Sequence, residues 1–274
     1  MHSCAVMSTG AAKCWGRNTY GQLGNNTNTN SHIPVDVSGL SGGVAAITAG
    51  SYHTCALLST GGVTCWGYGS DGELGDGTTT LWSNVPVDVS GLSTGVTAIA
   101  AGSYHTCALL TTGGVTCWGD NSFGQLGNST NTNSNIPVNV TGLSSGVTAI
   151  TAGGNHSCAL LSTGAVKCWG ENAHGQVGDS TTIDRPAPVN VTGLTTGVTT
   201  VTAGDNHSCA LLSTGGVTCW GYNQWGQLGD STTIDRHAPV NVTGLTTGVT
   251  AISAGGNHSC ALLSTGGVTC WGYN

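Results

Sequence analysis

The sequence predicts an all-β fold, a β-propeller with about six four-stranded blades. Its twelve cysteines form six Cys-x9-Cys pairs whose starts lie 51 or 52 residues apart, and a fixed period of about this size indicates a solenoid, propeller or array. Each period holds several short, β-type segments separated by turn residues, and none places apolar residues at helical spacing. We therefore expect one domain over residues 1–274, made of six repeat units of which the first and last are incomplete.

The unit that starts at Ala149 shows the four expected strands. The first strand is expected over Thr148–Ala152. Ser157–Leu161 and Val166–Trp169 are the second and third strands, joined by a short Gly-containing connection that is typical of a hairpin. The long segment that follows is rich in Gly, Asn, Asp, Ser and Thr and predicts a loop. Pro188–Val191 is the fourth strand, and its initial proline suits a sheet edge.

The two ends of the chain fall inside repeat units. Met1 stands where units two and three have Tyr52 and Tyr104, and Asn274 follows the third strand of unit six. The first unit is therefore expected to lack its first strand and the last unit its fourth. Two arrangements fit, a six-bladed ring with imperfect blades or a piece of a longer array. An unclosed ring exposes strand edges, which favours self-association, and light scattering at several concentrations measures this.

The position of the cysteines within the hairpin indicates how they pair. Cys55 and Cys65 are equally distant from Thr60, so they face each other at a separation that a disulfide bridges. Six intrablade disulfides imply an oxidising compartment, outside the cell or at its surface. The alternative is reduced cysteines that fill gaps between blades in a cytosol. The expected pairs are Cys4 with Cys14, Cys55 with Cys65, Cys107 with Cys117, Cys158 with Cys168, Cys209 with Cys219, and Cys260 with Cys270.

Composition and motifs argue against several classes of function. Five basic residues and a net charge of −7 oppose a nucleic-acid-binding surface, and no apolar run is long enough for membrane insertion. No cofactor or metal site is expected, because Cys-x9-Cys is not a zinc spacing and the acidic trio Asp71, Glu73 and Asp76 has too few ligands for a calcium loop. The Gly-x-Ser-x-Gly runs, such as Gly91–Gly95, join short strands and are interpreted as turns, so no catalytic residue is proposed and the chain is not expected to be an enzyme.

Two aromatic positions repeat in every unit, and repetition favours a structural role over a ligand-binding one. The histidine before each second strand is expected to anchor a turn by hydrogen bonds to the neighbouring blade, although a ring of imidazoles is also conceivable as a metal or proton-relay site. The tryptophan after each second cysteine is expected to pack between blades. These residues are His2, His53, His105, His156, His207 and His258, and Trp15, Trp66, Trp118, Trp169, Trp220 and Trp271.

The repeat resembles that of the regulator of chromosome condensation family. The resemblance rests on the run from Trp118 to Gly127, which reads WGDNSFGQLG, and on Ala149 to Leu160, which reads AITAGGNHSCAL. It covers essentially the whole chain and implies a β-propeller. The cysteine-containing version is most similar to large bacterial surface or secreted members. The basic features of the nuclear exchange factor are absent, so neither chromatin binding nor exchange activity is carried over.

Function is expected where the units differ, because packing requirements are shared by all blades. One position precedes the Gly-Gln-Leu-Gly run and is mostly aromatic, as protein interfaces are. Unit two also has a one-residue insertion in a loop with two apolar residues. The sequence therefore predicts a non-enzymatic scaffold that binds a protein or glycan through one propeller face, the alternative being a purely structural repeat module. The candidate binding residues are Tyr20, Asp71, Phe123, His174 and Trp225, with Leu81 and Trp82 in the insertion loop.

Overall fold

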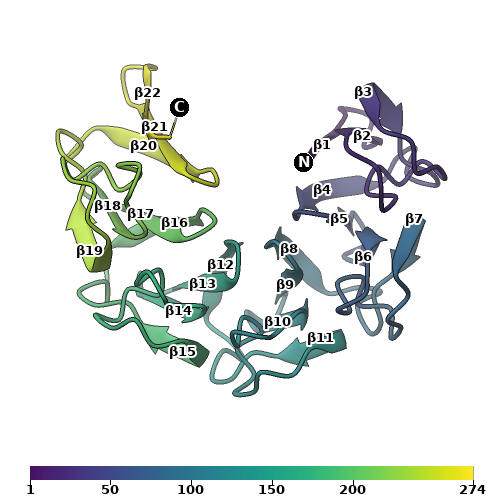
Figure 1. Cartoon of the computed structure of the whole chain (residues 1–274), viewed down its shortest axis with the longest axis horizontal. Coiled ribbons are helices and arrows are strands. Elements are labelled where there is room, and N and C mark those ends of the chain that lie inside the picture. The colour runs from purple at the N-terminus through teal and green to yellow at the C-terminus, as the bar shows by residue number, and fades with distance from the viewer. Residues whose placement is uncertain (274) are drawn as a thin grey trace.

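In the computed structural model, which describes residues 1–273, the chain forms six antiparallel sheets arranged as the blades of a propeller (Figure 1). The strands are β1 (His2–Val6), β2 (Ala12–Gly16), β3 (Ser31–Asp36), β4 (Val44–Ala49), β5 (His53–Leu58), β6 (Val63–Tyr68), β7 (Trp82–Asp88), β8 (Val96–Ala101), β9 (His105–Leu110), β10 (Val115–Gly119), β11 (Ser134–Asn139), β12 (Val147–Ala152), β13 (His156–Leu161), β14 (Val166–Gly170), β15 (Arg185–Asn190), β16 (Val198–Ala203), β17 (His207–Leu212), β18 (Val217–Gly221), β19 (Arg236–Asn241), β20 (Val249–Ala254), β21 (His258–Leu263) and β22 (Val268–Gly272).

Blades 2 to 5 have four strands each, in sequence order, whereas blade 1 (β1–β3) and blade 6 (β20–β22) have three. Within a complete blade the first strand lies nearest the axis and the fourth lies at the rim (Figure 1). The figure also shows an open arc, in which blades 1 and 6 do not meet. The predicted fold and the two incomplete sheets are therefore confirmed, and self-association through the open ends stays a prediction. No helix in the described chain has the length and apolar character needed to cross a membrane.

The fourth strand starts earlier than the sequence indicated. In blade 4 it begins at Arg185, which pairs with Gly170 across a bulge in the ladder, and it includes Pro186 as well as Pro188. Proline is tolerated there because this strand is the outer edge of the sheet and one side of its backbone needs no partner. In blade 2 the extra residue lengthens the ladder by one pair, Tyr68 with Trp82. The prediction that Trp82 lies in a loop is therefore wrong, since it is the first residue of β7.

The hydrophobic core lies between blades rather than within one. Five clusters each combine residues of two neighbouring blades, as where Trp118 of blade 3 packs among Cys55, Leu57 and Leu74 of blade 2. The middle strands are covered on both faces, so β9 is buried from His105 to Leu109. This explains why the apolar residues Cys107–Leu110 of this strand follow one another instead of alternating with polar ones.

All six predicted disulfides form, and each joins residues paired directly across the second and third strands. Cys55 pairs with Cys65 in the ladder, and in every blade the two Cα atoms are 4.0 to 4.1 Å apart. The hairpin turn between the two strands contains a glycine with positive φ. In blade 3 this is Gly113, at φ 77°, and a Cβ there would lie 2.8 Å from the Gly146 nitrogen of the next turn. A side chain would therefore push the two turns apart.

The repeated histidines bind the next blade. The Ser208 hydroxyl of blade 5 donates to the Gln176 carbonyl of blade 4 at 3.1 Å, so His156 Nε2 of blade 4, which lies 2.8 Å from that hydroxyl oxygen, is the donor. Burial lowers the pKa of His156 to about 3, which keeps the ring neutral. The structural interpretation is confirmed for five of the six histidines, whereas His258 of blade 6 is exposed and has no such contact in the described chain. The other contacts of this kind join His2 to Thr54, His53 to Thr106, His105 to Ser157 and His207 to Ser259.

The repeated tryptophans are also structural. The indole nitrogen of each one from blade 2 onward donates to a backbone carbonyl of the preceding blade at 2.9 Å. The accepting residue is Gln or Glu73, in the Gly-Gln-Leu-Gly run or its variant in that blade. Trp66, Trp118, Trp169 and Trp220 are fully buried. Because Trp N–H groups need a partner when buried, this bond fixes the loop of one blade against the core of the next.

Candidate protein-binding face

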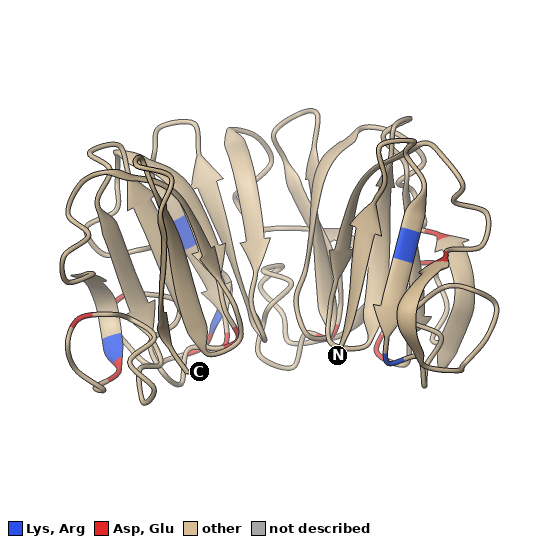
Figure 2. Ribbon diagram, turned by 90° about the horizontal axis from the view of Figure 1, so that it is seen from above, with Lys and Arg blue, Asp and Glu red and all other residues tan. Residues whose placement is uncertain are grey.

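Two sets of connections lie at the same end of the blades and form one face of the ring. They are the turn before each second strand and the loop after each third strand, and backbone hydrogen bonds join them, as from Tyr68 N to the Tyr52 carbonyl at 2.9 Å and from Asp120 N to the Tyr104 carbonyl at 2.8 Å. Both termini lie at this face, which forms the lower edge of the ring in Figure 2. We call it the terminal face.

The five variable candidates belong to this face because each lies in the loop after a third strand. Their backbones are held alike, since the N–H of four of them donates to a buried Gln side chain two residues later, at 2.9 to 3.0 Å. In blade 2 the acceptor is Glu73 and the donor is Asp71. The scaffold of each loop is thus the same, and only the side chain on it differs from blade to blade.

The variable residues make different contacts with neighbouring blades. Tyr20 contacts the rings of Tyr52 and Tyr68, with centroids 5.6 and 5.1 Å away. His174 Nδ1 lies 2.8 Å from an Asp235 carboxylate oxygen, and its ring is 4.7 Å from that of Tyr222.

The remaining candidates are spread around the ring. Trp225 is 51% exposed and contacts Tyr273 edge-on, while Phe123 is half-buried. Leu81 and Trp82 are 48% and 42% exposed, so the predicted apolar pair of blade 2 is accessible. The structure therefore places the five variable residues on one face without gathering them into a single cluster.

Glu73 differs from its equivalents in the other blades, all of which are glutamines. It is fully buried, its Oε2 accepts the Asp71 N–H at 2.9 Å, and its Oε1 has no hydrogen-bond partner in the described structure. Burial raises the pKa of Glu73 to about 8, and the nearby carboxylates of Asp71 and Asp120 act in the same direction. This side chain is therefore largely protonated at neutral pH.

Replacing Glu73 with Gln is expected to stabilise the protein at high pH. The folded pKa, about 8, exceeds the ordinary value of 4.5, so the folded state holds a proton that the unfolded state releases, and this residue lowers stability progressively as pH rises from 4.5 to 8. At pH 9 the variant should gain about 1–3 kcal/mol, because it removes a carboxylate that is costly to bury in its charged form, and at pH 4.5 almost nothing. Thermal melting at both pH values measures the difference.

The reciprocal substitution, Gln176→Glu, provides a control for this prediction. It places the same carboxyl in a buried site of blade 4 and should destabilise the protein at pH 9 more than at pH 4.5. Because the buried histidines affect every variant equally, only the difference between each variant and the original protein is informative. Equal effects of Glu73→Gln at both pH values would contradict the assigned protonation.

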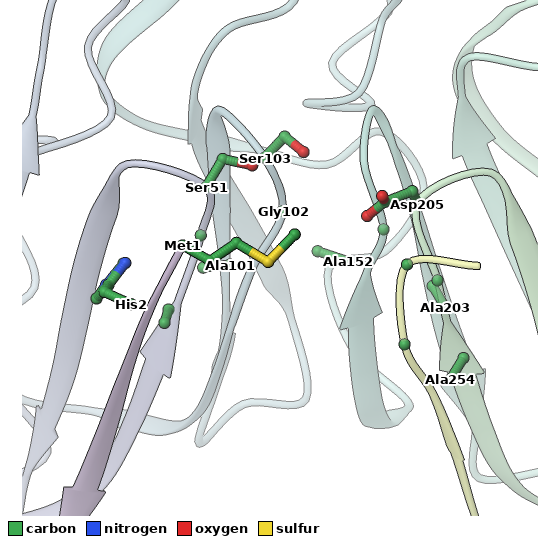
Figure 3. Close-up of a pocket in the computed structure, with 16 residues that line it drawn as sticks. Met1, His2, Ser51, Ala101, Gly102, Ser103, Ala152, Ala203, Asp205 and Ala254 are labelled. Carbon is green, nitrogen blue, oxygen red and sulfur yellow. The ribbon is translucent and has the colours of Figure 1, made fainter. Parts of the chain in front are cut away.

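The axis of the ring contains a pocket of about 280 Å³ lined mainly by Ala, Gly and Ser residues of the first strands and the turns after them. Figure 3 shows Ser51, Ser103 and Asp205 around it, together with the side chain of Met1. Asp205 is its one carboxylate, since the equivalent residues are Ser or Gly. Within residues 1–273, no three His, Cys, Asp or Glu side chains lie close enough together to hold a metal ion.

The structure brings together residues that the sequence analysis did not select. Tyr52 and Tyr104 join Tyr20 and Tyr68 in one group of contacting rings. A signal was present, because the residue before the repeated histidine is Tyr in units two and three but Asn in units four to six. A second signal was the single Glu at position 73 in a run that otherwise has Gln.

Comparison with known proteins places this geometry in a family. The profile described as "RCC1-like domain" matches residues 1–274. The E3 ubiquitin-protein ligase HERC2 of Homo sapiens is 33% identical over 95% of this chain and 6% of its own length. The ultraviolet-B receptor UVR8 of Arabidopsis thaliana is 34% identical over 87% of this chain and 55% of its own length. The chain thus spans from about a twentieth to about half of these relatives.

Solved structures agree with this assignment. Human WBSCR16 superimposes with a TM-score of 0.84 at 26% identity, over 96% of this chain and 69% of that one. Yeast RCC1 (Prp20), in its complex with Kap60, gives a TM-score of 0.86 at 22% identity, over 100% of this chain and 68% of that one, which supports the fold. From its repeats, its blades and these matches, the chain belongs to the RCC1-like domain family.

Proposed function

We propose that this chain is a non-enzymatic binding scaffold that engages a protein partner through its terminal face. The observation that carries the proposal is the contrast between two classes of position. Residues that repeat, such as His156 and Trp169, are buried and hydrogen-bonded between blades, whereas the loop positions that vary carry exposed or half-exposed aromatic and charged side chains. Aromatic residues of this kind are what dominate binding energy at protein interfaces.

The comparisons support a protein partner over other classes. RCC1-like propellers are generally binding or exchange-factor scaffolds, and yeast RCC1 has been solved with Kap60 bound. Net negative charge supports the absence of nucleic acid from the partners of this chain. Six disulfides support an oxidising, extracellular or cell-surface location. A glycan partner and a purely structural spacer remain the competing proposals.

Alanine substitution of Phe123 and Trp225 tests the proposal. The immobilised chain is used to capture proteins from culture supernatant and host extract, and the affinity of each purified candidate is then measured. A binder loses at least about 5-fold in affinity in either variant, as truncation of an interface anchor does, while its melting temperature stays unchanged.

Ser145→Ala is the matched control for this experiment, because Ser145 is exposed on a turn at the opposite end of the blades. It should leave binding unaltered. A spacer predicts that Phe123→Ala, Trp225→Ala and Ser145→Ala behave alike, and that result would remove the binding function.

A further inference from the structure

Four tyrosines of blades 1 to 3 form a closed cycle of contacting rings on the terminal face. Successive centroids lie 5.6 Å apart for Tyr20–Tyr52, 5.7 Å for Tyr52–Tyr104, 6.2 Å for Tyr104–Tyr68 and 5.1 Å for Tyr68–Tyr20. All four side chains are half-buried, so part of each ring faces solvent. We call these four residues the tyrosine patch.

The patch is not required by the repeat. Blades 4 to 6 have Asn155, Asn206 and Asn257 where blades 2 and 3 have the tyrosines of the turn, and their turns have the same backbone bonds, such as Glu171 N to the Asn155 carbonyl at 2.9 Å. The backbone is therefore satisfied with either residue. The packing that all blades share therefore does not explain why four tyrosines lie together at one place on the ring.

The tyrosine rings already hold one cation. The guanidinium carbon of Arg17 lies 5.2 Å from the centroid of Tyr52 and 5.9 Å from that of Tyr20, within the range of a cation–π interaction. This contact occupies the blade 1 side of the patch. Tyr68 and Tyr104, on the other side, contact no Lys or Arg of the described chain in this way.

Carboxylates border that other side. Asp120 lies next to Tyr104, because the Asp120 N–H donates to the Tyr104 carbonyl. Asp71 is half-buried beside Asp120, and the Asn133 amide lies 3.2 Å from Asp71 Oδ1. Behind them is the fully buried Glu73, whose Oε1 has no partner in the described structure. Burial raises the pKa of Asp71, and the charge of Asp120 contributes to that increase.

The basic residues of the chain do not supply that cation. Lys13 is paired with Asp36, Arg185 with Asp179 and Arg236 with Asp230. Arg17 lies over the far pair of rings, and Lys167 lies in β14 of blade 4. Figure 2 shows most Asp and Glu residues toward the edge of the ring that carries both termini. The charge of this face therefore complements a positively charged partner.

We infer that Tyr68 and Tyr104, with Asp71 and Asp120 at their border, bind an arginine or lysine side chain in an exposed segment of the partner protein. This inference rests on the proposed function and adds to it the chemistry of the partner. The aromatic faces contact the cationic group, while the carboxylates supply charge and hydrogen-bond acceptors.

Short peptides test the inference directly. The probes are a capped Gly/Ser peptide with three arginines, the same peptide with three lysines, and uncharged versions in which citrulline or acetyl-lysine replaces each cation. Titration calorimetry at low salt should show binding of the charged peptides only. Tyr68→Leu should weaken that binding about 5-fold and Asp71→Asn about 3-fold, as loss of a cation–π contact or an ion pair does.

Two further variants separate a cation site from a merely apolar one. Tyr222→Leu alters the equivalent position of blade 5 and should leave peptide binding unchanged. Arg17→Ala removes a competing cation and should tighten binding about 2-fold, whereas an apolar site would bind no better. Circular dichroism melts confirm that each variant is folded.

The outcomes distinguish this inference from the proposed function. Equal binding of charged and citrulline peptides, no binding of any peptide, or binding of an oligosaccharide such as maltohexaose that Tyr68→Leu abolishes would each overturn the inference. If the partner captured on the immobilised chain is lost in Trp225→Ala but retained in Tyr68→Leu, the face binds protein and the cation site alone is wrong. If no variant of the face affects capture, the proposed function is wrong as well.

Discussion

Replacing Trp118 with alanine is expected to lower the free energy of unfolding by about 3–5 kcal/mol, the usual range for a buried Trp in a core. Its side chain is fully buried between blades 2 and 3, and its indole N–H donates to the Glu73 carbonyl at 2.9 Å. The substitution removes both the packing and the hydrogen bond that joins the blades. Thermal melting measures the loss, expected at roughly 6–15 °C for a chain of this size.

Trp15→Ala is the matched control, because Trp15 holds the same repeat position in blade 1. It is half-buried, and its indole nitrogen donates to no residue that the structure describes. The expected loss is therefore less than half that of Trp118→Ala. Trp118→Phe keeps an aromatic ring but removes the hydrogen bond and part of the packing, so it should cost at least about 1 kcal/mol and less than Trp118→Ala. Equal losses for the two alanine variants would show that the tryptophans stabilise their own blades and not the contacts between blades.

The fold could be predicted from the sequence because the repeat multiplies each local signal. A single Cys-x9-Cys hairpin is weak evidence, but six of them at a constant period leave few architectures. The same repetition indicated that the histidines have a structural role and not a ligand-binding one. Since His156 and its equivalents hold the same place in every unit, one explanation is expected for all of them, and the hydrogen bond to the next blade provides it wherever a next blade is present.

The candidate site could be predicted only in part, because side chains far apart in sequence meet through the stacking of blades. The variability of Tyr20 and Asp71 was visible in the alignment of units. The contact of Tyr20 with Tyr52 and Tyr68 was not, since it depends on the distance between neighbouring blades at the terminal face. The unpartnered Glu73 oxygen was also hidden, because the sequence shows Glu in place of Gln but not its burial.

Edge geometry explains the remaining errors. The fourth strand begins at Arg185 rather than at Pro188 because a bulge opposite Gly170 lets the ladder continue past Pro186. The proline predicts the start of the strand, whereas an edge strand accommodates proline internally. Trp82 likewise lies in β7, since the inserted residue extends the ladder instead of the loop.

Removing the disulfide of blade 4, by Cys158→Ala together with Cys168→Ala, is expected to cost about 3 kcal/mol, because an unfolded chain without this link gains the entropy of a loop of about ten residues. Both residues are fully buried, so lost packing adds to this cost. The pair in blade 6, Cys260 and Cys270, closes a loop of the same length but is partly exposed. Its replacement should therefore cost less, and the difference between the two double variants measures the packing contribution.

The same difference in burial predicts the order of reduction. Dithiothreitol under native conditions should reduce Cys260–Cys270 first, because a thiolate must reach the sulfur atoms to attack them, and the fully buried pair Cys158–Cys168 only when its blade opens. Alkylation followed by mass spectrometry gives the order, and melting after each stage gives the stability that remains. About twelve free thiols in the denatured, unreduced protein would remove both the disulfides and the argument for an oxidising compartment. A blade held by its cross-link in this way would lose stability in a reducing cytosol, so the same melts determine whether the fold depends on the compartment proposed for it.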